Sequence, residues 1–252
     1  IRPFMIRYLS DSLPLYIVTE HPKSGGSWVG QMLADYLDVP FPRNRVPSIE
    51  ACIMHGHYLR RNLQGRGRTF VVIRDGRDVM VSWYYHCFFI NDRENQRLVS
   101  RMRRWLPFED YHDIRANLPE FIRFHFSYKR PFGFSWADFT RDWVADDSRL
   151  PYYIKYERLL EDGVNELAQA ISAVLKMQPD VDWISTIVDK YSFTNLSGRK
   201  QGEEQKNSFL RKGIAGDWKN HFSEESKELF DKYAGEELIR LGYEEDHSWA
   251  AA

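Results

Sequence analysis

Cysteine is scarce in this chain, which has Cys52 and Cys87 alone among its 252 residues. The two stand in unrelated contexts and lack the spacing of metal ligands, so the sequence predicts neither a disulfide framework nor a zinc site. A chain without a disulfide framework is typical of a reducing compartment, and we therefore expect a cytoplasmic protein.

Long apolar runs and a large net charge are also missing. No stretch approaches the ~20 apolar residues that a membrane-spanning helix requires, and no signal-peptide pattern opens the chain. We therefore expect no membrane association of this sequence, while its first residue, Ile1, is not an initiator methionine and leaves an upstream anchor open. The formal net charge of −1 argues against nucleic acid as a partner, because surfaces that bind nucleic acid are strongly basic.

Apolar runs and helical patterns alternate along the chain. The predicted strands lie near residues 15–20, 51–55, 69–73 and 152–155. The predicted helices lie near residues 27–38, 76–86, 118–127, 163–175, 181–190 and 223–242. This alternation is typical of an α/β fold, in which a central parallel β-sheet is flanked by helices on both faces and ligands bind at the carboxyl ends of the strands. Length and composition predict a single domain over residues 1–252.

A turn rich in small residues joins the first predicted strand to the first predicted helix. Its sequence from Pro22 to Trp28 is PKSGGSW. Small residues let backbone N–H groups converge on a phosphate, the helix N-terminus adds partial positive charge, and Lys23 adds a full charge. The lysine precedes the glycines, so the turn is not the Gly-Lys-Ser/Thr loop that holds a triphosphate with Mg²⁺. The turn indicates a P-loop-like site for a nucleotide-type ligand, and a tight structural connection without a ligand is the alternative.

A second strand meets a helix at residues 69–86. Arg74 closes the strand, Asp75 is well placed as an N-cap, and Ser82 follows two helical turns later. Arg74 and Ser82 could face one anion if the chain folds back over the strand end. An ordinary capped amphipathic helix with an Arg–Asp pair is the alternative.

Together, these turns resemble the family of sulfotransferases that use 3′-phosphoadenosine 5′-phosphosulfate (PAPS). Pro22–Trp28 looks like the family's 5′-phosphosulfate loop, Arg74 through Ser82 looks like its 3′-phosphate element, and Phe209–Asn220 looks like its C-terminal signature. The resemblance covers roughly residues 15–225 and is weak over 87–150. It implies transfer of a sulfuryl group from PAPS to a hydroxyl or amine of a small-molecule or glycan-type acceptor by in-line displacement. The product would be 3′-phosphoadenosine 5′-phosphate (PAP), and the resemblance implies no metal.

The resemblance also implies the two catalytic residues. It casts Lys23 as the group that bonds the bridging oxygen of the phosphosulfate, where charge develops as the S–O bond breaks. His57 falls at the position of the family's general base. An imidazole suits that role, because it can take a proton from an acceptor hydroxyl near neutral pH. His55 as the base, or a structural role for both histidines, stays open. His55 stands where the family has a lysine, and Gly26-Ser27 stands where two threonines are common.

The resemblance assigns further residues to the nucleotide. The 5′-phosphosulfate loop comprises Lys23, Ser24, Gly25, Gly26, Ser27 and Trp28. The 3′-phosphate ligands are Arg74, Ser82, Arg211, Lys212 and Gly213. Adenine would lie against Trp28, Tyr156 and Phe193, next to Tyr191, Ser192, Phe209 and Leu210. Each aromatic residue could equally belong to the core. His86 is interpreted as structural, because it lies well along a helix beyond the phosphate end.

Two further points concern partners and alternatives. Residues 219–224 resemble the family's short dimer segment, but Glu224 falls where a valine is usual, so a homodimer of that type is doubtful. A kinase-like, nucleotide-dependent phosphotransferase is the second enzyme hypothesis. A catalytically silent nucleotide-binding module is the third.

Overall fold

The computed structural model describes residues 2–9, 12–42, 50–63, 68–90, 95–144 and 152–251. It contains two compact units. We call the first the sheet unit (Ile1–Arg74 with Phe139–Gly198) and the second the helical unit (Asp75–Asp138 with Arg199–Ala252). One domain over residues 1–252 stays a prediction.

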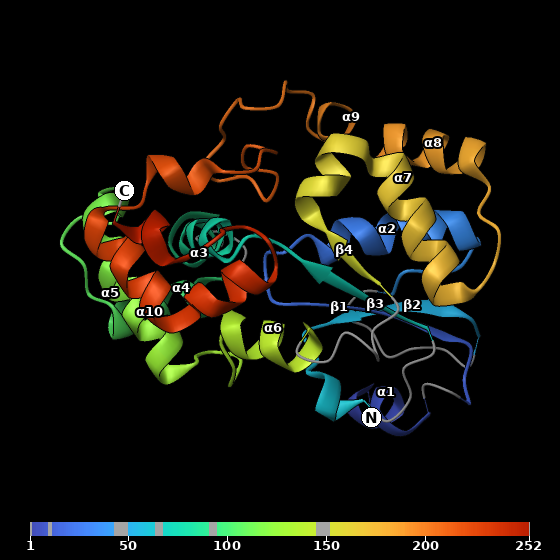
Figure 1. Cartoon of the computed structure of the whole chain (residues 1–252), viewed down its shortest axis with the longest axis horizontal. Helices are drawn as coiled ribbons and strands as arrows, with labels where there is room; N and C mark the ends of the chain where they lie inside the picture. The colour runs from blue at the N-terminus through green and yellow to red at the C-terminus, as the bar shows by residue number, and fades with distance from the viewer. Residues whose placement is uncertain are drawn as a thin grey trace. The chain divides into compact units, whose positions relative to one another are not determined.

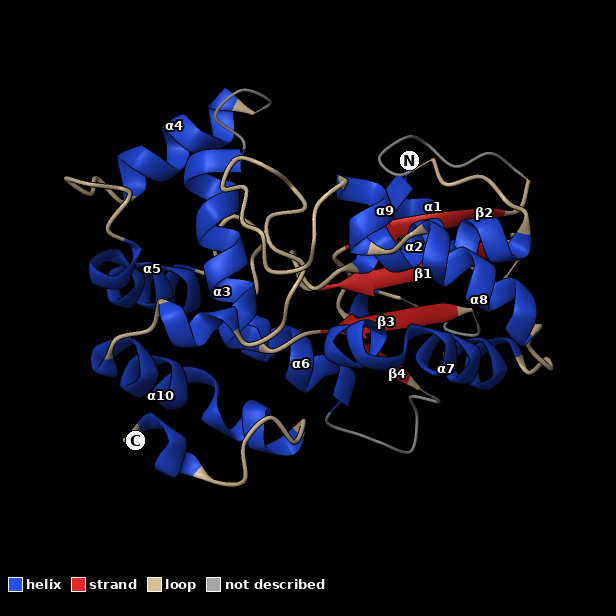
Figure 2. Cartoon of the chain, turned by 90° about the horizontal axis from the view of Figure 1, so that it is seen from above, coloured by secondary structure: helices blue, strands red, loops and turns tan. Residues whose placement is uncertain are grey.

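The sheet unit is built around four parallel strands. They are β1 (Leu15–Glu20), β2 (Cys52–Gly56), β3 (Thr69–Ile73) and β4 (Tyr153–Lys155). Their order across the sheet is β2-β1-β3-β4, as Figure 2 shows. Strands β1, β2 and β3 are buried along almost all of their length, which explains why each reads as a nearly continuous apolar run. All four predicted strands are confirmed.

The order of the strands places both phosphate-type turns side by side. The chain moves from β1 to β2 on one side and then returns to β3 on the other side of β1. Glu20, the last residue of β1, is in register with Val72 near the end of β3. The turns that leave β1 and β3 therefore begin at the topological switch point, where open α/β sheets bind their ligands.

Helices lie on both faces of the sheet (Figure 1). On one face lie α2 (Gly26–Leu37), α7 (Tyr156–Leu175) and α8 (Val181–Lys190), whose apolar side chains pack against the strands in one core cluster. On the other lies α1 (Arg2–Leu9). The predicted parallel α/β architecture is confirmed.

The helical unit contains no strand among its described residues. Its main helices are α3 (Gly76–Tyr85), α4 (Gln96–Trp105), α5 (Ile114–Tyr128) and α10 (Glu224–Arg240). Helix α3 continues into a π-helical turn over His86–Ile90, and 3₁₀ turns cover Asp217–Asn220 and His247–Ala250.

The predicted helices correspond to α2, α3, α5, α7, α8 and α10. Four helices were not predicted, namely α1, α4, α6 (Trp136–Val144) and α9 (Phe193–Ser197). Helix α4 shows the reason, because Val99 and Met102 are its only buried residues and they leave a weak apolar signal. No helix among the described residues is long and apolar enough to cross a membrane.

Two aspartates organise the N-terminus of α3. Asp75 caps the helix by accepting the N–H of Arg77 at 2.9 Å, as its place in the sequence predicts. Asp78 accepts the N–H groups of Gly216 and Trp218 at 2.8 and 2.9 Å. Asp78 therefore ties the Gly-Asp-Trp segment to α3. The structure also gives His86 a packing role, because its ring stacks on Trp83 with centroids 5.1 Å apart.

Candidate active site

The loop after β1 adopts backbone conformations suited to convergent N–H groups. Lys23 has a φ of +75° and Gly25 has a φ of +101°. A left-handed conformation costs a non-glycine residue about 1–2 kcal/mol, and such strain concentrates at functional sites. Gly25 is required for a second reason, since a Cβ there would lie 2.8 Å from the ring of Tyr156.

Ser24 presents an unused hydroxyl in this loop. The residue is buried, and its Oγ has no hydrogen-bond partner among the described residues. A buried hydroxyl without a partner is costly, so Ser24 fits a loop that completes its hydrogen bonds with an anion. Lys23 beside it supplies positive charge. The loop therefore fits the phosphosulfate group that the sequence predicts.

Aromatic residues predicted for adenine gather beside the loop. The edge of Trp28 meets the ring of Tyr156 with centroids 5.9 Å apart, and Trp28 Nε1 donates to the carbonyl of Tyr191 at 2.8 Å. The guanidinium of Arg74 lies 4.2 Å from the Tyr156 ring centroid and donates to the carbonyl of Lys23 at 3.3 Å. The structure thus brings these predicted residues from α2, α7 and the segments after β1, β3 and α8 into one cluster.

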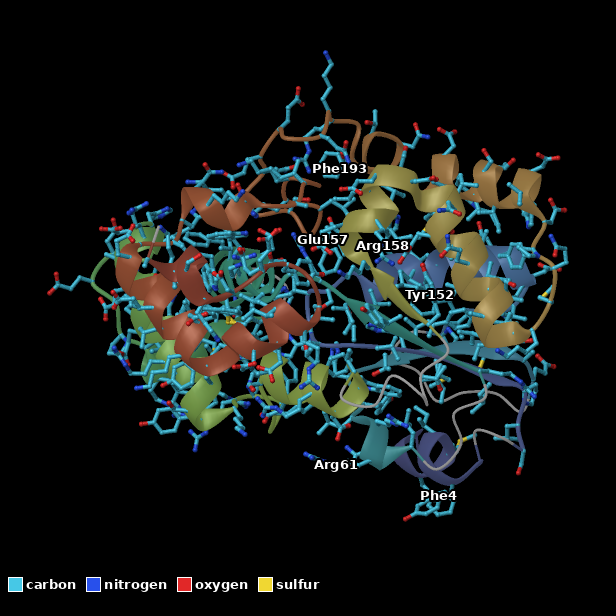
Figure 3. All side chains as sticks on the ribbon, in the orientation of Figure 1. Phe4, Arg61, Tyr152, Glu157, Arg158 and Phe193 are labelled. Atoms are coloured by element: carbon cyan, nitrogen blue, oxygen red, sulfur yellow. The ribbon has the colours of Figure 1, made fainter. Side chains whose placement is uncertain are left out.

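Two neighbouring residues, Ser192 and Phe193, also contribute to the local structure. The hydroxyl of Ser192 accepts the N–H of Asn195 at 3.3 Å and so caps α9. Phe193 begins α9 and is buried (labelled in Figure 3). Their predicted contact with the nucleotide stays a prediction.

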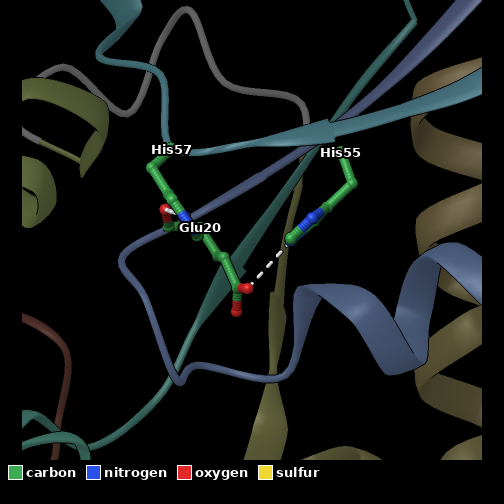
Figure 4. A group of neighbouring side chains, drawn as sticks. All are labelled: Glu20, His55 and His57. Carbon is green, nitrogen blue, oxygen red and sulfur yellow. Dashed lines mark hydrogen bonds and ion pairs between the residues drawn. The ribbon is translucent and has the colours of Figure 1, made fainter. Parts of the chain in front are cut away.

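Glu20, His55 and His57 form a cluster where β1 and β2 end (Figure 4). Glu20 Oε1 lies 2.9 Å from His55 Nε2, and the main-chain carbonyl of Glu20 lies 3.1 Å from His57 Nδ1. A carbonyl oxygen can only accept, so His57 Nδ1 carries a proton. In the neutral ring, His57 Nε2 is then the nitrogen without a proton, as a general base requires.

The carboxylate of Glu20 was not predicted as part of the site. It is fully enclosed, and its Oε2 accepts the N–H of Gly26 at 2.6 Å. Burial raises the pKa of Glu20, but the hydrogen bond and charge of His55, the charge of His57 and the Gly26 N–H together lower it below its usual value. Glu20 is therefore ionised at neutral pH. One N–H of the small-residue turn, that of Gly26, is directed to this carboxylate.

In the helical unit, two predicted phosphate ligands meet acidic partners. Lys212 Nζ lies 2.6 Å from Asp217 Oδ1, and Arg211 forms ion pairs with both Asp217 and Glu204. Burial raises the pKa of Asp217, but the hydrogen bond of His221 and the contacts of Lys212 and Arg211 lower it well below its usual range. The two cations are thus held in place before any ligand arrives.

Other predicted residues of the helical unit are placed as follows. The guanidinium of Arg211 lies 4.4 Å from the ring centroid of Tyr85 on α3. Gly213 has a φ of +65°, which explains a glycine there. Ser82 lies on α3 and is partly exposed, Phe209 is about half exposed, and the carbonyl of Leu210 accepts from Arg199. The residues assigned to the nucleotide are therefore divided between the two units.

These features define an α/β protein with a P-loop-like turn at the switch point of a parallel sheet, beside a histidine equipped to act as a base. The sulfotransferase domain model matches residues 14–242, and the chain belongs to this family. The resemblance that the sequence motifs predict is thereby confirmed, and the chain is an enzyme of this class.

Curated relatives and solved structures agree with the family. Sulfotransferase 1E1 of Cavia porcellus is 27% identical over 265 residues, covering 88% of this chain and 82% of that protein. The 3-beta-hydroxysteroid sulfotransferase of the same species is 24% identical, covering 88% and 83%. The crystal structure of mouse sulfotransferase SULT7A1 complexed with PAP aligns with a TM-score of 0.62 at 19% identity, covering 89% of this chain and 84% of that one. Retinol dehydratase in a complex with retinol and PAP aligns with a TM-score of 0.63 at 16% identity, covering 89% and 81%.

Proposed function

We propose that this protein transfers a sulfuryl group from PAPS to a hydroxyl or amine of an acceptor and releases PAP. The observation that carries the proposal is the placement of the Lys23–Ser24 loop and of His57, whose Nδ1 faces the Glu20 carbonyl, at neighbouring strand ends of one sheet. PAP is present in the solved structures of mouse SULT7A1 and of retinol dehydratase. These similarities support the same donor here.

The sheet unit supplies the groups for the 5′ side of the donor. Lys23, the hydroxyl of Ser24 and the N–H groups of Gly25 and Ser27 would hold the phosphosulfate, because the N–H of Gly26 is directed to Glu20 and those of Ser24 and Trp28 to main-chain carbonyls. Trp28, Tyr156 and Phe193 would hold adenine, next to Tyr191 and Ser192. Arg74, at the end of β3, stays assigned to the 3′-phosphate. In the helical unit, we assign Ser82, Arg211, Lys212 and the Gly213 N–H to the 3′-phosphate, next to Phe209 and Leu210. Guanidinium and ammonium donors suit a phosphate dianion.

The chemical step rests on His57 and Lys23. His57 Nε2 takes the proton of the acceptor hydroxyl, while its Nδ1–H stays bonded to the Glu20 carbonyl and stabilises the ring as it becomes charged. The ammonium of Lys23 stabilises the negative charge that develops on the departing phosphate oxygen. No step of this mechanism uses a metal ion.

The acceptor is proposed as a small molecule or glycan. Retinol and androsterone are bound in the retinol dehydratase structures, which supports an apolar acceptor bearing one hydroxyl.

The dimer segment of the family is altered at Glu224, which is exposed in the first turn of α10 and pairs with Lys227 at 3.1 Å. A charge that is already partnered and solvated opposes burial in a dimer contact. We propose a cytoplasmic protein that does not use this dimer mode.

The proposal is tested by thermal unfolding in parallel with PAP, 5′-AMP and ATP–Mg²⁺, followed by transfer of labelled sulfate from PAPS to an acceptor panel. At 100-fold over Kd a ligand adds about 2.7 kcal/mol, so PAP is expected to raise the midpoint by roughly 5–10 °C. AMP is expected to give a much smaller shift. Equal shifts with AMP would contradict the 3′-phosphate assignment. A preference for ATP–Mg²⁺ would favour the phosphotransferase, and tight PAP binding without transfer to any acceptor would favour the silent module.

The ion pair between Glu204 and Arg211 gives a prediction for donor affinity. The Glu204 carboxylate competes with a phosphate for the Arg211 guanidinium. The variant Glu204→Gln is therefore expected to bind PAP about three- to tenfold more tightly by calorimetry, because a charged hydrogen bond is worth about 1.5–3 kcal/mol before solvent screening.

The neighbouring Glu203→Gln serves as the control for this prediction, because its exposed carboxylate accepts the N–H of Lys200 at 3.3 Å. Its PAP affinity is expected to stay at the wild-type value. Unchanged or weaker binding by Glu204→Gln would show that Arg211 does not exchange one anion for another.

A further inference from the structure

One residue, Glu20, contacts three parts of the candidate site. Glu20 Oε2 accepts the N–H of Gly26, which opens α2, and Glu20 Oε1 contacts His55 of β2 at 2.9 Å. The main-chain carbonyl of the same residue fixes the proton of His57 (Figure 4). Glu20 therefore reaches the phosphosulfate loop, His55 and the base.

Gly26 completes the arrangement. A Cβ on Gly26 would lie 2.7 Å from Glu20 Cδ and 3.0 Å from His55 Nε2, distances that real Cβ atoms do not tolerate without a shift. The glycine is thus required by the carboxylate and imidazole packed against it. Residues 20, 26 and 55 form one interlocked set.

The charge of this set matters for anion binding. Glu20 is 4% exposed and His55 is 8% exposed, so little solvent screens the carboxylate. A buried carboxylate without a positive partner is strongly unfavourable, and at the start of α2 it would also repel an anionic donor. A protonated His55 cancels that charge.

On the basis of the proposed function, we propose that Glu20 and His55 are positioning residues that act as a buried, charge-neutral pair. The Glu20 carboxylate holds the first turn of α2, and its main chain holds His57 in the tautomer that a base requires. The protonated His55 neutralises the carboxylate, so the loop can accept a phosphosulfate. His55 is therefore not the base, because its Nε2 is committed to Glu20.

A double-mutant cycle with Glu20→Gln and His55→Gln tests the pair, with PAP affinity measured by calorimetry and kcat and KM measured for PAPS. Glu20→Gln keeps an oxygen for the Gly26 N–H and is expected to change PAP affinity by less than about threefold. His55→Gln leaves the carboxylate buried without a positive partner, so PAP binding is expected to weaken at least about tenfold. The double variant is expected to return to within about threefold of wild type in PAP affinity and to retain measurable kcat.

The rescue in the double variant is the decisive result, because a residue with an independent structural role would not regain affinity when a second residue is changed. If His55→Gln alone does not fold, recovery of the thermal midpoint by the added Glu20→Gln supports the pair, and an unfolded double variant overturns it. A double variant that binds PAP as weakly as His55→Gln also overturns it.

Two other outcomes bear on the base and on the proposed function. Recovered binding with complete loss of turnover would make His55 the base. Absence of PAP binding by the wild type would reject the proposed function, and the midpoints of the four proteins would still test the pair.

Discussion

Lys23→Ala is expected to lower kcat for sulfate transfer by about 100- to 1,000-fold. Removing one preorganised donor that faces developing negative charge costs an enzyme about 2.7–4 kcal/mol of transition-state stabilisation. PAP affinity is expected to fall much less, because the hydroxyl of Ser24 and the backbone N–H groups remain. The comparison of kcat for PAPS with Kd for PAP therefore separates transition-state stabilisation from binding.

Lys176→Ala is the matched control for Lys23→Ala. Lys176 is an exposed lysine with a φ of +57° at the C-cap of α7, so both substitutions remove a lysine from a left-handed position. Lys176→Ala is expected to leave kcat unchanged. A Lys23→Ala protein that keeps more than a third of wild-type kcat would contradict the assigned role, and a loss of PAP affinity with kcat unchanged would indicate uniform binding instead.

The sheet could be predicted from the sequence almost residue by residue. Strands β1 and β3 are buried on both faces, so each is a continuous apolar run between polar turns. The order β2-β1-β3-β4 could not be predicted from any single segment, because it depends on which strands pair with each other. Helix α4 escaped prediction because it is rich in arginine and buries only two residues, so its segment lacks the apolar content expected of a helix packed on a core.

The site was partly predictable, because the family's motifs are local in sequence. Lys23 and Ser24 belong to one short turn, and Arg211 and Lys212 belong to one signature. Glu20 was missed, because its contacts with residues 26 and 55 arise only when β1 and β2 pair in the observed register. An acidic residue at the end of an apolar strand is the signal that could have identified it, since a buried carboxylate requires a partner.

The acidic partners of the predicted phosphate ligands were missed for a similar reason, because ion pairs form only in the folded chain. Asp217 lies within the C-terminal signature, so its pairing with Lys212 is local. Glu204 lies in a polar segment outside the signature and reaches Arg211 through a turn in which Gln205 N–H bonds the Arg211 carbonyl at 2.9 Å. A sequence pattern shows that positive charges are present but not which carboxylates hold them.

His57→Ala is expected to lower kcat by about 100- to 10,000-fold while PAP affinity stays within about threefold of wild type. A positioned general base contributes that range to a proton-transfer step, and the lost imidazole is not assigned to the nucleotide. His247→Ala is the control, because His247 is an exposed histidine paired with Asp231 in the helical unit. Its kcat is expected to match the wild type.

Added imidazole distinguishes a missing base from a disturbed fold. The deletion of the His57 side chain leaves space beside the Glu20 carbonyl, which can accept an N–H from free imidazole as it does from His57 Nδ1. Such an imidazole presents its other nitrogen to the acceptor, so the kcat of His57→Ala is expected to rise with imidazole concentration. No rise in His57→Ala, combined with a rise in a folded His55→Ala protein, would transfer the role of base to His55. The carbonyl that fixes the tautomer is thus what makes rescue at residue 57 possible, because a free imidazole needs that acceptor to orient its lone pair.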